Sequence, residues 1–98
     1  MTISEFIERV TRVHDFLTTV RYAHPTLYII CTAKKFEGLA PEIRFDWFCK
    51  TSAIPAADAE TVLASPMFEL VLATPDERAR DYGYLDAIST STSWLSAF

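Results

Sequence analysis

The stretch IRFDWFCK, residues 43–50, decides the fold that this sequence predicts. Its apolar residues recur at every second position, at Ile43, Phe45, Trp47 and Cys49. A period of two along such a stretch indicates a strand with one buried face. A helix would spread the same side chains around most of its circumference, so we favour the strand. In this strand Trp47 faces the core and Phe48 lies on the opposite face.

A second strand is predicted just before this stretch. Residues 27–33, LYIICTA, are rich in residue types that favour strands. The next residues, KKFEGLAP, contain the first glycine and predict a loop. If the two strands form an antiparallel hairpin around this loop, Ile29 lies opposite Trp47 on the inner face.

The outer face of this hairpin carries three large apolar side chains. Tyr28 and Ile30 alternate with the inward residues of the first strand, and Phe48 does the same on the second. The register also keeps Cys31 and Cys49 on different rungs, which are too far apart for a disulfide. The two cysteines should therefore be buried free thiols.

The first twenty residues predict a long amphipathic helix. Apolar residues follow one another at spacings of three and four, at Ile3, Phe6, Ile7, Val10, Val13, Leu17 and Val20. Thr2 and Glu5 fit a capping box at the helix start. Pro25 should end the helix before the first strand. Residues 16–22 also alternate, so an additional strand there stays open.

The second half of the chain predicts a helix and then a strand. Residues 56–65 fit a short helix that Pro66 would end, and residues 67–73, MFELVLA, fit a third strand. Alternation places Phe68, Leu70 and Leu72 on the inner face of that strand.

A last helix begins with a strong local signal. Thr74 is suited to the N-cap and Pro75 to the first helical position, and acidic residues follow in the first turn. The helix should continue to about Ile88 and be weakened or broken at Gly83. The final residues, 89–98, are a hydroxyl-rich tract that leads to Trp94, Leu95 and Phe98.

Length and composition favour one domain. The chain has 98 residues, half of them hydrophobic, which is ample for one core. We therefore predict a single α+β domain over residues 1–98. It has an antiparallel sheet of three to four strands, with a long N-terminal helix and one or two further helices packed on it.

Charge is distributed unevenly along the chain. The formal net charge is −4, and residues 51–98 hold seven acidic and two basic side chains. Direct binding of nucleic acid needs clustered lysine and arginine, so this distribution disfavours it. An acidic field suits a basic protein partner. The alternative is an ordinary solvated surface with a modest charge bias.

The sequence contains no recognisable targeting signal or cofactor-binding motif. No apolar run approaches the roughly 20 residues that cross a bilayer, and the N-terminus MTISEFIERV lacks the basic region of a secretory signal. We expect a cytoplasmic protein that does not bind membranes. Phosphate-binding, zinc-binding and redox motifs are missing from the sequence, so we expect no cofactor and no metal. One chemical alternative is a thiol enzyme that uses Cys31 and His14.

These observations favour a non-enzymatic protein-binding protein. The expected binding surface combines the outer aromatic face with acidic residues and the C-terminal aromatics: Tyr28, Ile30, Phe48, Asp76, Glu77, Asp81, Trp94 and Phe98. The alternative is that the protein's own tail covers this face.

Small inhibitors of nucleic-acid-handling proteins, such as immunity proteins and phage anti-defence proteins, share this profile of small size, acidity and exposed aromatics. An accessory or assembly subunit and a homo-oligomer are further alternatives.

Overall fold

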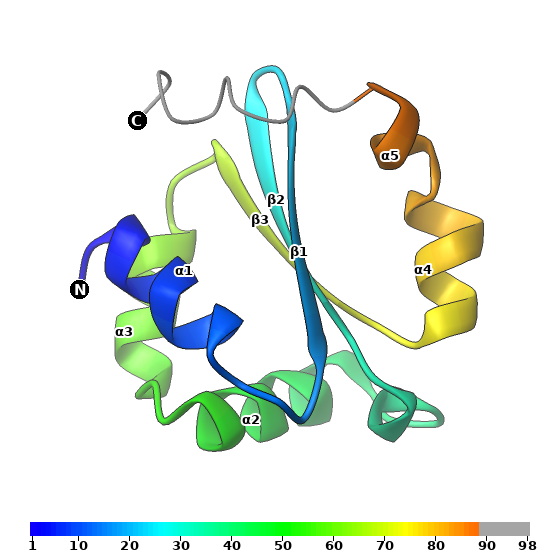
Figure 1. The fold of residues 1–98 in the computed structure, drawn as a ribbon. Coiled ribbons are helices and arrows are strands. Elements are labelled where there is room, and N and C mark those ends of the chain that lie inside the picture. The colour runs from blue at the N-terminus through cyan, green and yellow to red at the C-terminus, as the bar shows by residue number, and fades with distance from the viewer. Residues whose placement is uncertain (89–98) are drawn as a thin grey trace.

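The computed structural model describes residues 1–88, which form a three-stranded sheet between two layers of helices (Figure 1). The strands are β1 (Leu17–Ala23), β2 (Thr26–Thr32) and β3 (Phe68–Ala73), in the order β1-β2-β3. β1 and β2 form an antiparallel hairpin, in which Val20 lies opposite Ile29. β3 runs parallel to β2, with Leu70 opposite Ile29. The α+β class is thus confirmed, but the sheet is mixed and not antiparallel.

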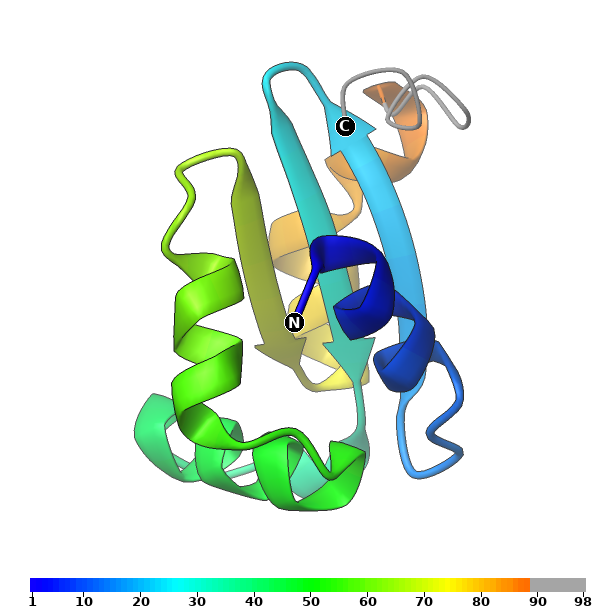
Figure 2. The same cartoon turned by 90° about the vertical axis from the view of Figure 1, so that its left-hand side faces the viewer.

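Helices cover both faces of the sheet. The elements are α1 (Ile3–Thr11), η1 (Lys34–Phe36), α2 (Pro41–Ser52), α3 (Ala56–Leu63), α4 (Pro75–Tyr82) and α5 (Tyr84–Ile88). In Figure 2, α1 and α3 lie in front of the sheet and α4 lies behind it. The larger core lies between one face of the sheet and α1, α2 and α3. A smaller core lies between the other face and α5.

Residues 43–50 are helical, so the strand predicted there is wrong. Pro41 occupies the first turn of α2 after the extended Ala40, which is a favourable helix start. Asp46 and Lys50 form an ion pair one helical turn apart, at 3.0 Å. The larger cause is topological, because two parallel strands need a crossover connection. α2 and α3 provide that connection between β2 and β3.

The helix also reverses the predicted roles of two aromatic side chains. Phe48 is fully buried, and its ring packs against those of Phe6 and Phe16. Trp47 is only partly buried and makes edge contacts with Phe16 and Phe36. Neighbouring residues of a helix lie about 100° apart, so both side chains can face one broad core. Phe48 therefore does not lie on an outer face.

The N-terminal helix is shorter than predicted. The capping box of Thr2 and Glu5 is confirmed, with both reciprocal hydrogen bonds at 3.2 Å. α1 ends at Thr11, however, and the open alternative of an additional strand is the correct one. Strand β1 contains β-branched residues in succession, which favour extended backbone. Leu17 fits the helical spacing by coincidence, since 68% of its surface is exposed.

The elements predicted for the second half are confirmed. Leu70 and Leu72 of β3 pack against the larger core, and Val71 lies in the smaller core on the opposite face. The predicted break at Gly83 separates α4 from α5. A Cβ atom at this position would lie 2.6 Å from the carbonyl oxygen of Ala79, so the close approach requires glycine. The predictions for Trp94 and Phe98 lie outside the described residues.

Substitution of Phe48 tests the corrected assignment. Phe48→Ala should lower the free energy of unfolding by about 3–5 kcal/mol, because it opens a cavity in the larger core. Ile43→Ala is the matched control, since 52% of Ile43 is exposed, and it should change stability by less than about 0.5 kcal/mol. Urea denaturation measures both values. Equal losses for the two variants would contradict the burial of Phe48.

Candidate functional site

The free edge of β3 is the first component of the candidate site. The carbonyl oxygens of Met67 and Ala73 accept hydrogen bonds from the β2 side, at 2.7 and 3.1 Å. Backbone groups alternate in direction along a strand, so those of Leu70 and Leu72 point away from β2. Within residues 1–88, no strand pairs with this side of β3. The middle of β3 therefore presents unpaired strand edge.

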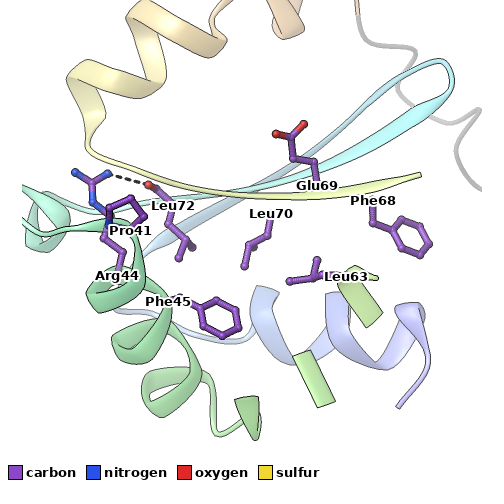
Figure 3. A pocket seen from close by; sticks show the side chains of 8 residues that line it. All are labelled: Pro41, Arg44, Phe45, Leu63, Phe68, Glu69, Leu70 and Leu72. Carbon is purple, nitrogen blue, oxygen red and sulfur yellow. Dashed lines mark hydrogen bonds between the residues drawn. The ribbon is translucent and has the colours of Figure 1, made fainter. Parts of the chain in front are cut away.

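A groove lined mainly by apolar residues lies directly beneath this edge, with a volume of about 440 Å³. We call it the β3 groove. It is lined from α2, α3 and β3 by Pro41, Arg44, Phe45, Leu63, Phe68, Leu70 and Leu72, and by Glu69, whose carboxylate nevertheless points to the other face of the strand. Figure 3 shows Phe45, Leu63 and Leu70 converging on the groove from three different elements. Apolar side chains on the underside of a strand edge could receive alternate side chains of an extended peptide.

The side chain of Glu69 lies on the other face of β3. Figure 3 shows its carboxylate pointing away from the groove. Burial is the main cause that raises the pKa of Tyr28 and of Tyr82, and the charge of Glu69 adds to both shifts. Glu69 forms no ion pair within the described part of the chain. An uncompensated carboxylate thus lies near two tyrosine hydroxyls, on the face opposite the groove.

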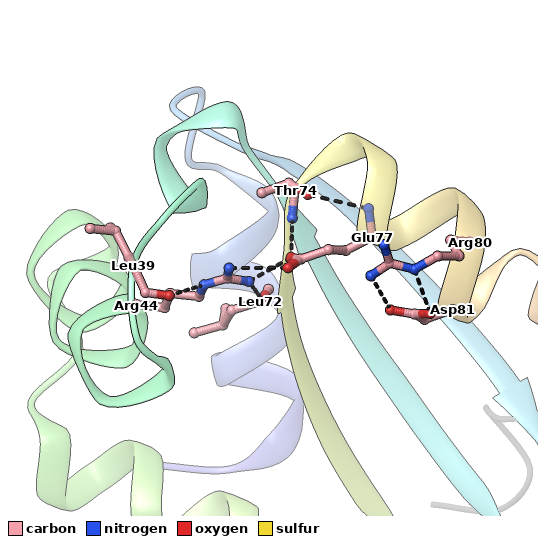
Figure 4. Close-up of polar contacts among 7 residues, drawn as sticks. All are labelled: Leu39, Arg44, Leu72, Thr74, Glu77, Arg80 and Asp81. Atoms are coloured by element: carbon pink, nitrogen blue, oxygen red, sulfur yellow. Dashed lines mark hydrogen bonds and ion pairs between the residues drawn. The ribbon is translucent and has the colours of Figure 1, made fainter.

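Arg44 closes one end of the edge. Its guanidinium donates to the carbonyl oxygens of Leu39 and Leu72, each at 2.9 Å (Figure 4). The same group holds both carboxylate oxygens of Glu77, at 2.6 and 3.2 Å. Glu77 also accepts from the N–H of Thr74 at 2.9 Å as part of the capping box of α4. Arg44 therefore ties α2, β3 and α4 together.

Only part of the predicted acidic cluster keeps charge that a basic partner could use. Hydrogen bonds from Arg44 and from the Thr74 backbone lower the pKa of Glu77 to about 2. Asp81 accepts two hydrogen bonds from the neighbouring Arg80, each at 3.0 Å. Asp76 is exposed and forms no ion pair within residues 1–88. Of the three carboxylates, only Asp76 keeps an uncompensated charge.

The residues of the predicted outer aromatic face do not form one exposed surface in the structure. Ile30 and Phe48 are both fully buried, and they lie in cores on opposite faces of the sheet. Tyr28 keeps partial exposure. Sequence reasoning missed the β3 groove because it depends on a parallel strand with a helical crossover. The apolar run LVLA at the end of β3 is the signal, since strands buried on both faces read in this way.

The structure gives no support to thiol chemistry at Cys31. This side chain is fully buried, 4.0 Å from the hydroxyl of Thr18, and burial raises its pKa to about 12. His14 is exposed in the segment between α1 and β1. A nucleophilic cysteine needs a lowered pKa and a base in contact. Residues 1–88 also contain no group of three side chains that could hold a metal ion.

Comparison with known proteins gives no relative, because no family model, curated protein or solved structure matches this chain. Among the helices of residues 1–88, none has the length and apolar character that crossing a bilayer requires. The case for function therefore depends on the site itself.

Glu77→Gln tests the network around Arg44. Glutamine retains an acceptor for the Thr74 N–H but loses the charge. The free energy of unfolding at pH 7 should therefore fall by about 1 kcal/mol. The folded-state pKa lies below the ordinary value of 4.5, so the stabilisation is present above pH 4.5 and disappears as pH falls towards 2. Urea denaturation across this range should show the two proteins converging.

The control for this experiment is Asp81→Asn. Asp81 and Arg80 are adjacent and exposed, so their pairing should not measurably alter stability. A difference between wild type and Glu77→Gln that stays constant from pH 7 to the acid limit would show that the charge of Glu77 contributes nothing.

The cysteines give a second test. Both thiols are free and buried, and Cys49 keeps 7% exposure whereas Cys31 has none. Iodoacetamide should alkylate the native protein slowly, Cys49 first, and the denatured protein quickly at both positions. Peptide mass analysis measures each rate. A native mass lower by two hydrogens would reveal a disulfide and contradict the structure.

Proposed function

We propose that this chain is a non-enzymatic protein-binding protein that recognises a basic partner through the edge of β3 and the groove beneath it. The unpaired edge beside the β3 groove is the observation that carries the proposal. An edge strand above an apolar groove is one of the recurring arrangements by which proteins capture peptide segments. Pockets of this kind supply specificity, and backbone hydrogen bonds supply affinity.

The charge around the site supports a basic partner. Arg44 lines the groove, but Glu77 compensates its charge. Glu69 lies on the same strand edge without an ion pair among the described residues, and Glu42 is exposed beside Pro41. The local field is therefore negative, as is the charge of residues 51–98. Such a field accelerates association with a positively charged surface.

An inhibitor of a nucleic-acid-handling protein fits these features best. Proteins that bind phosphates present clustered lysine and arginine, and a small acidic domain can occupy that surface in competition with nucleic acid. The proposed role is thus similar to that of immunity proteins and phage anti-defence proteins, by analogy of physical profile. We place this activity in the cytoplasm, where Cys31 and Cys49 would remain thiols.

Affinity capture with matched variants tests the proposal. Leu63→Arg puts a cation into the β3 groove and should abolish recovery of the partner, because it obstructs the apolar site and repels a basic segment. Leu17→Arg makes the same change on the exposed start of β1 and should leave recovery unchanged. The association rate constant should also fall about tenfold between low salt and about 0.5 M salt.

The recovered partner decides between the alternatives. An inhibitor should suppress nucleic-acid binding by the partner when added at equal concentration. A partner that remains fully active in the complex would indicate an accessory subunit. Recovery of the same proteins by wild type and by a folded Leu63→Arg variant would overturn the proposal.

A further inference from the structure

We infer that β3 accepts an extended segment of the partner as a fourth strand, and that this segment alternates apolar with basic side chains. The inference rests on the proposed function and specifies the chemistry of what is bound. It follows from three properties of β3: the direction of its backbone groups, the groove on one face and the carboxylate on the other.

The backbone of β3 can hold an added strand along its middle. The N–H and C=O of Leu70 and the N–H of Leu72 point away from β2. The C=O of Leu72 is already bonded to Arg44, which limits the added strand at this end. The added segment is therefore short, pairing with about three to five residues of β3.

The two sides of β3 select different side chains. Successive residues of a strand point to opposite faces, so every second residue of the added segment faces the groove. There it meets Phe45, Leu63 and Leu70, which favour apolar side chains such as valine or leucine.

The remaining side chains of the added segment lie on the face that carries Glu69. This carboxylate lacks an ion pair within residues 1–88, and it acts electrostatically on the hydroxyls of Tyr28 and Tyr82. A lysine or arginine placed here gains a charge-assisted hydrogen bond to Glu69 and aromatic surface beside it. An acidic side chain would be repelled, so the chemistry of this face selects basic residues.

A second copy of this chain fits the edge less well. The sequence of β3, FELVLA, contains no basic residue that could compensate Glu69. In an antiparallel pairing of two β3 strands centred on Leu70, the two Glu69 carboxylates would lie on the same face. Each Glu69 then lies opposite Val71 of the other strand and diagonal to the other Glu69, within reach of long side chains, so the two carboxylates repel each other. The edge is thus better matched to a different, basic segment.

Synthetic peptides test the inference on the intact protein. The probe is a capped peptide of about eight residues that alternates valine and lysine, and the comparison peptide replaces each lysine with glutamate. NMR reports hydrogen exchange at individual amides. Saturating valine–lysine peptide should slow exchange at Leu70 and Leu72 at least about tenfold, with no change at Val71, which already points towards β2. The glutamate peptide should leave all three unchanged.

N-methylation of the peptide backbone distinguishes strand addition from binding that uses no backbone hydrogen bonds. In an added strand, the N–H groups of alternate residues point towards β3 and the others point to solvent. N-methylation of one alternate set should therefore abolish binding, whereas N-methylation of the other set should leave it nearly intact. Equal loss with both peptides, or no loss with either, would overturn the inference.

Charge variants test the role of Glu69. Glu69→Gln should weaken binding of the valine–lysine peptide about fivefold to tenfold. Glu60→Gln removes the same charge from an exposed position on α3 and should have little effect. Equal weakening by both variants would show that only the net charge matters and would overturn the assignment to Glu69.

Two further outcomes would overturn the addition of a partner strand, but they leave capture of a partner through the β3 groove to its own test. One is peptide binding that leaves exchange at Leu70 and Leu72 unchanged. The other is slower exchange at these amides when the concentration of the protein rises without peptide, which would show that a second copy covers the edge. The proposed function is tested separately, because it fails if the folded Leu63→Arg variant recovers the same partner as wild type, whatever the peptides show.

Discussion

The pairing of Arg44 with Glu77 is the constraint on which the arrangement of this domain depends. The Arg44 side chain is only 14% exposed, so its charge needs a partner and its donors need acceptors. Those acceptors come from the loop at Leu39, from the end of β3 and from the first turn of α4. One side chain on α2 therefore fixes the relative positions of helices on opposite faces of the sheet.

The same pairing shapes the candidate site. By anchoring α2 at the end of β3, Arg44 holds Phe45 as one wall of the β3 groove. By bonding to Leu72, it closes one end of the strand edge and leaves the middle open. By compensating Glu77, it removes one carboxylate from the local charge, so that Glu69 and Glu42 are carboxylates near the groove without an ion pair in the described chain. Packing, edge geometry and local charge thus share one cause.

Sequence reasoning succeeded where structure depends on a few neighbouring residues, as at the capping box of Thr2, the N-cap at Thr74 and the break at Gly83. It failed at residues 43–50, where five of eight residues are apolar and four of them recur at every second position, so that a strand was favoured over a helix. What decides between them is the parallel pairing of β2 with β3, a long-range property that local spacing does not encode. The predicted aromatic site depended on a period of two at residues 43–50. Because this period was wrong, Phe48 was assigned to an exposed outer face. The acidic bias of the second half does not depend on the fold and stays valid.

The two edges of the sheet differ in a way that supports the proposed binding site at β3. Natural proteins protect strand edges with charged residues or covering elements, because an open edge invites pairing. β1 has both: α5 packs against it, and Arg21 donates to the carbonyl of Val20 and pairs with Asp86 of α5. Within residues 1–88, β3 is closed only at its two ends, by Arg44 at the carbonyl of Leu72 and by the hydrogen bond from the Phe68 N–H to the carbonyl of Ser65. The groove beneath the strand would make unintended pairing along its middle more favourable. This contrast between the two edges supports the proposed binding of a partner segment along the middle of β3.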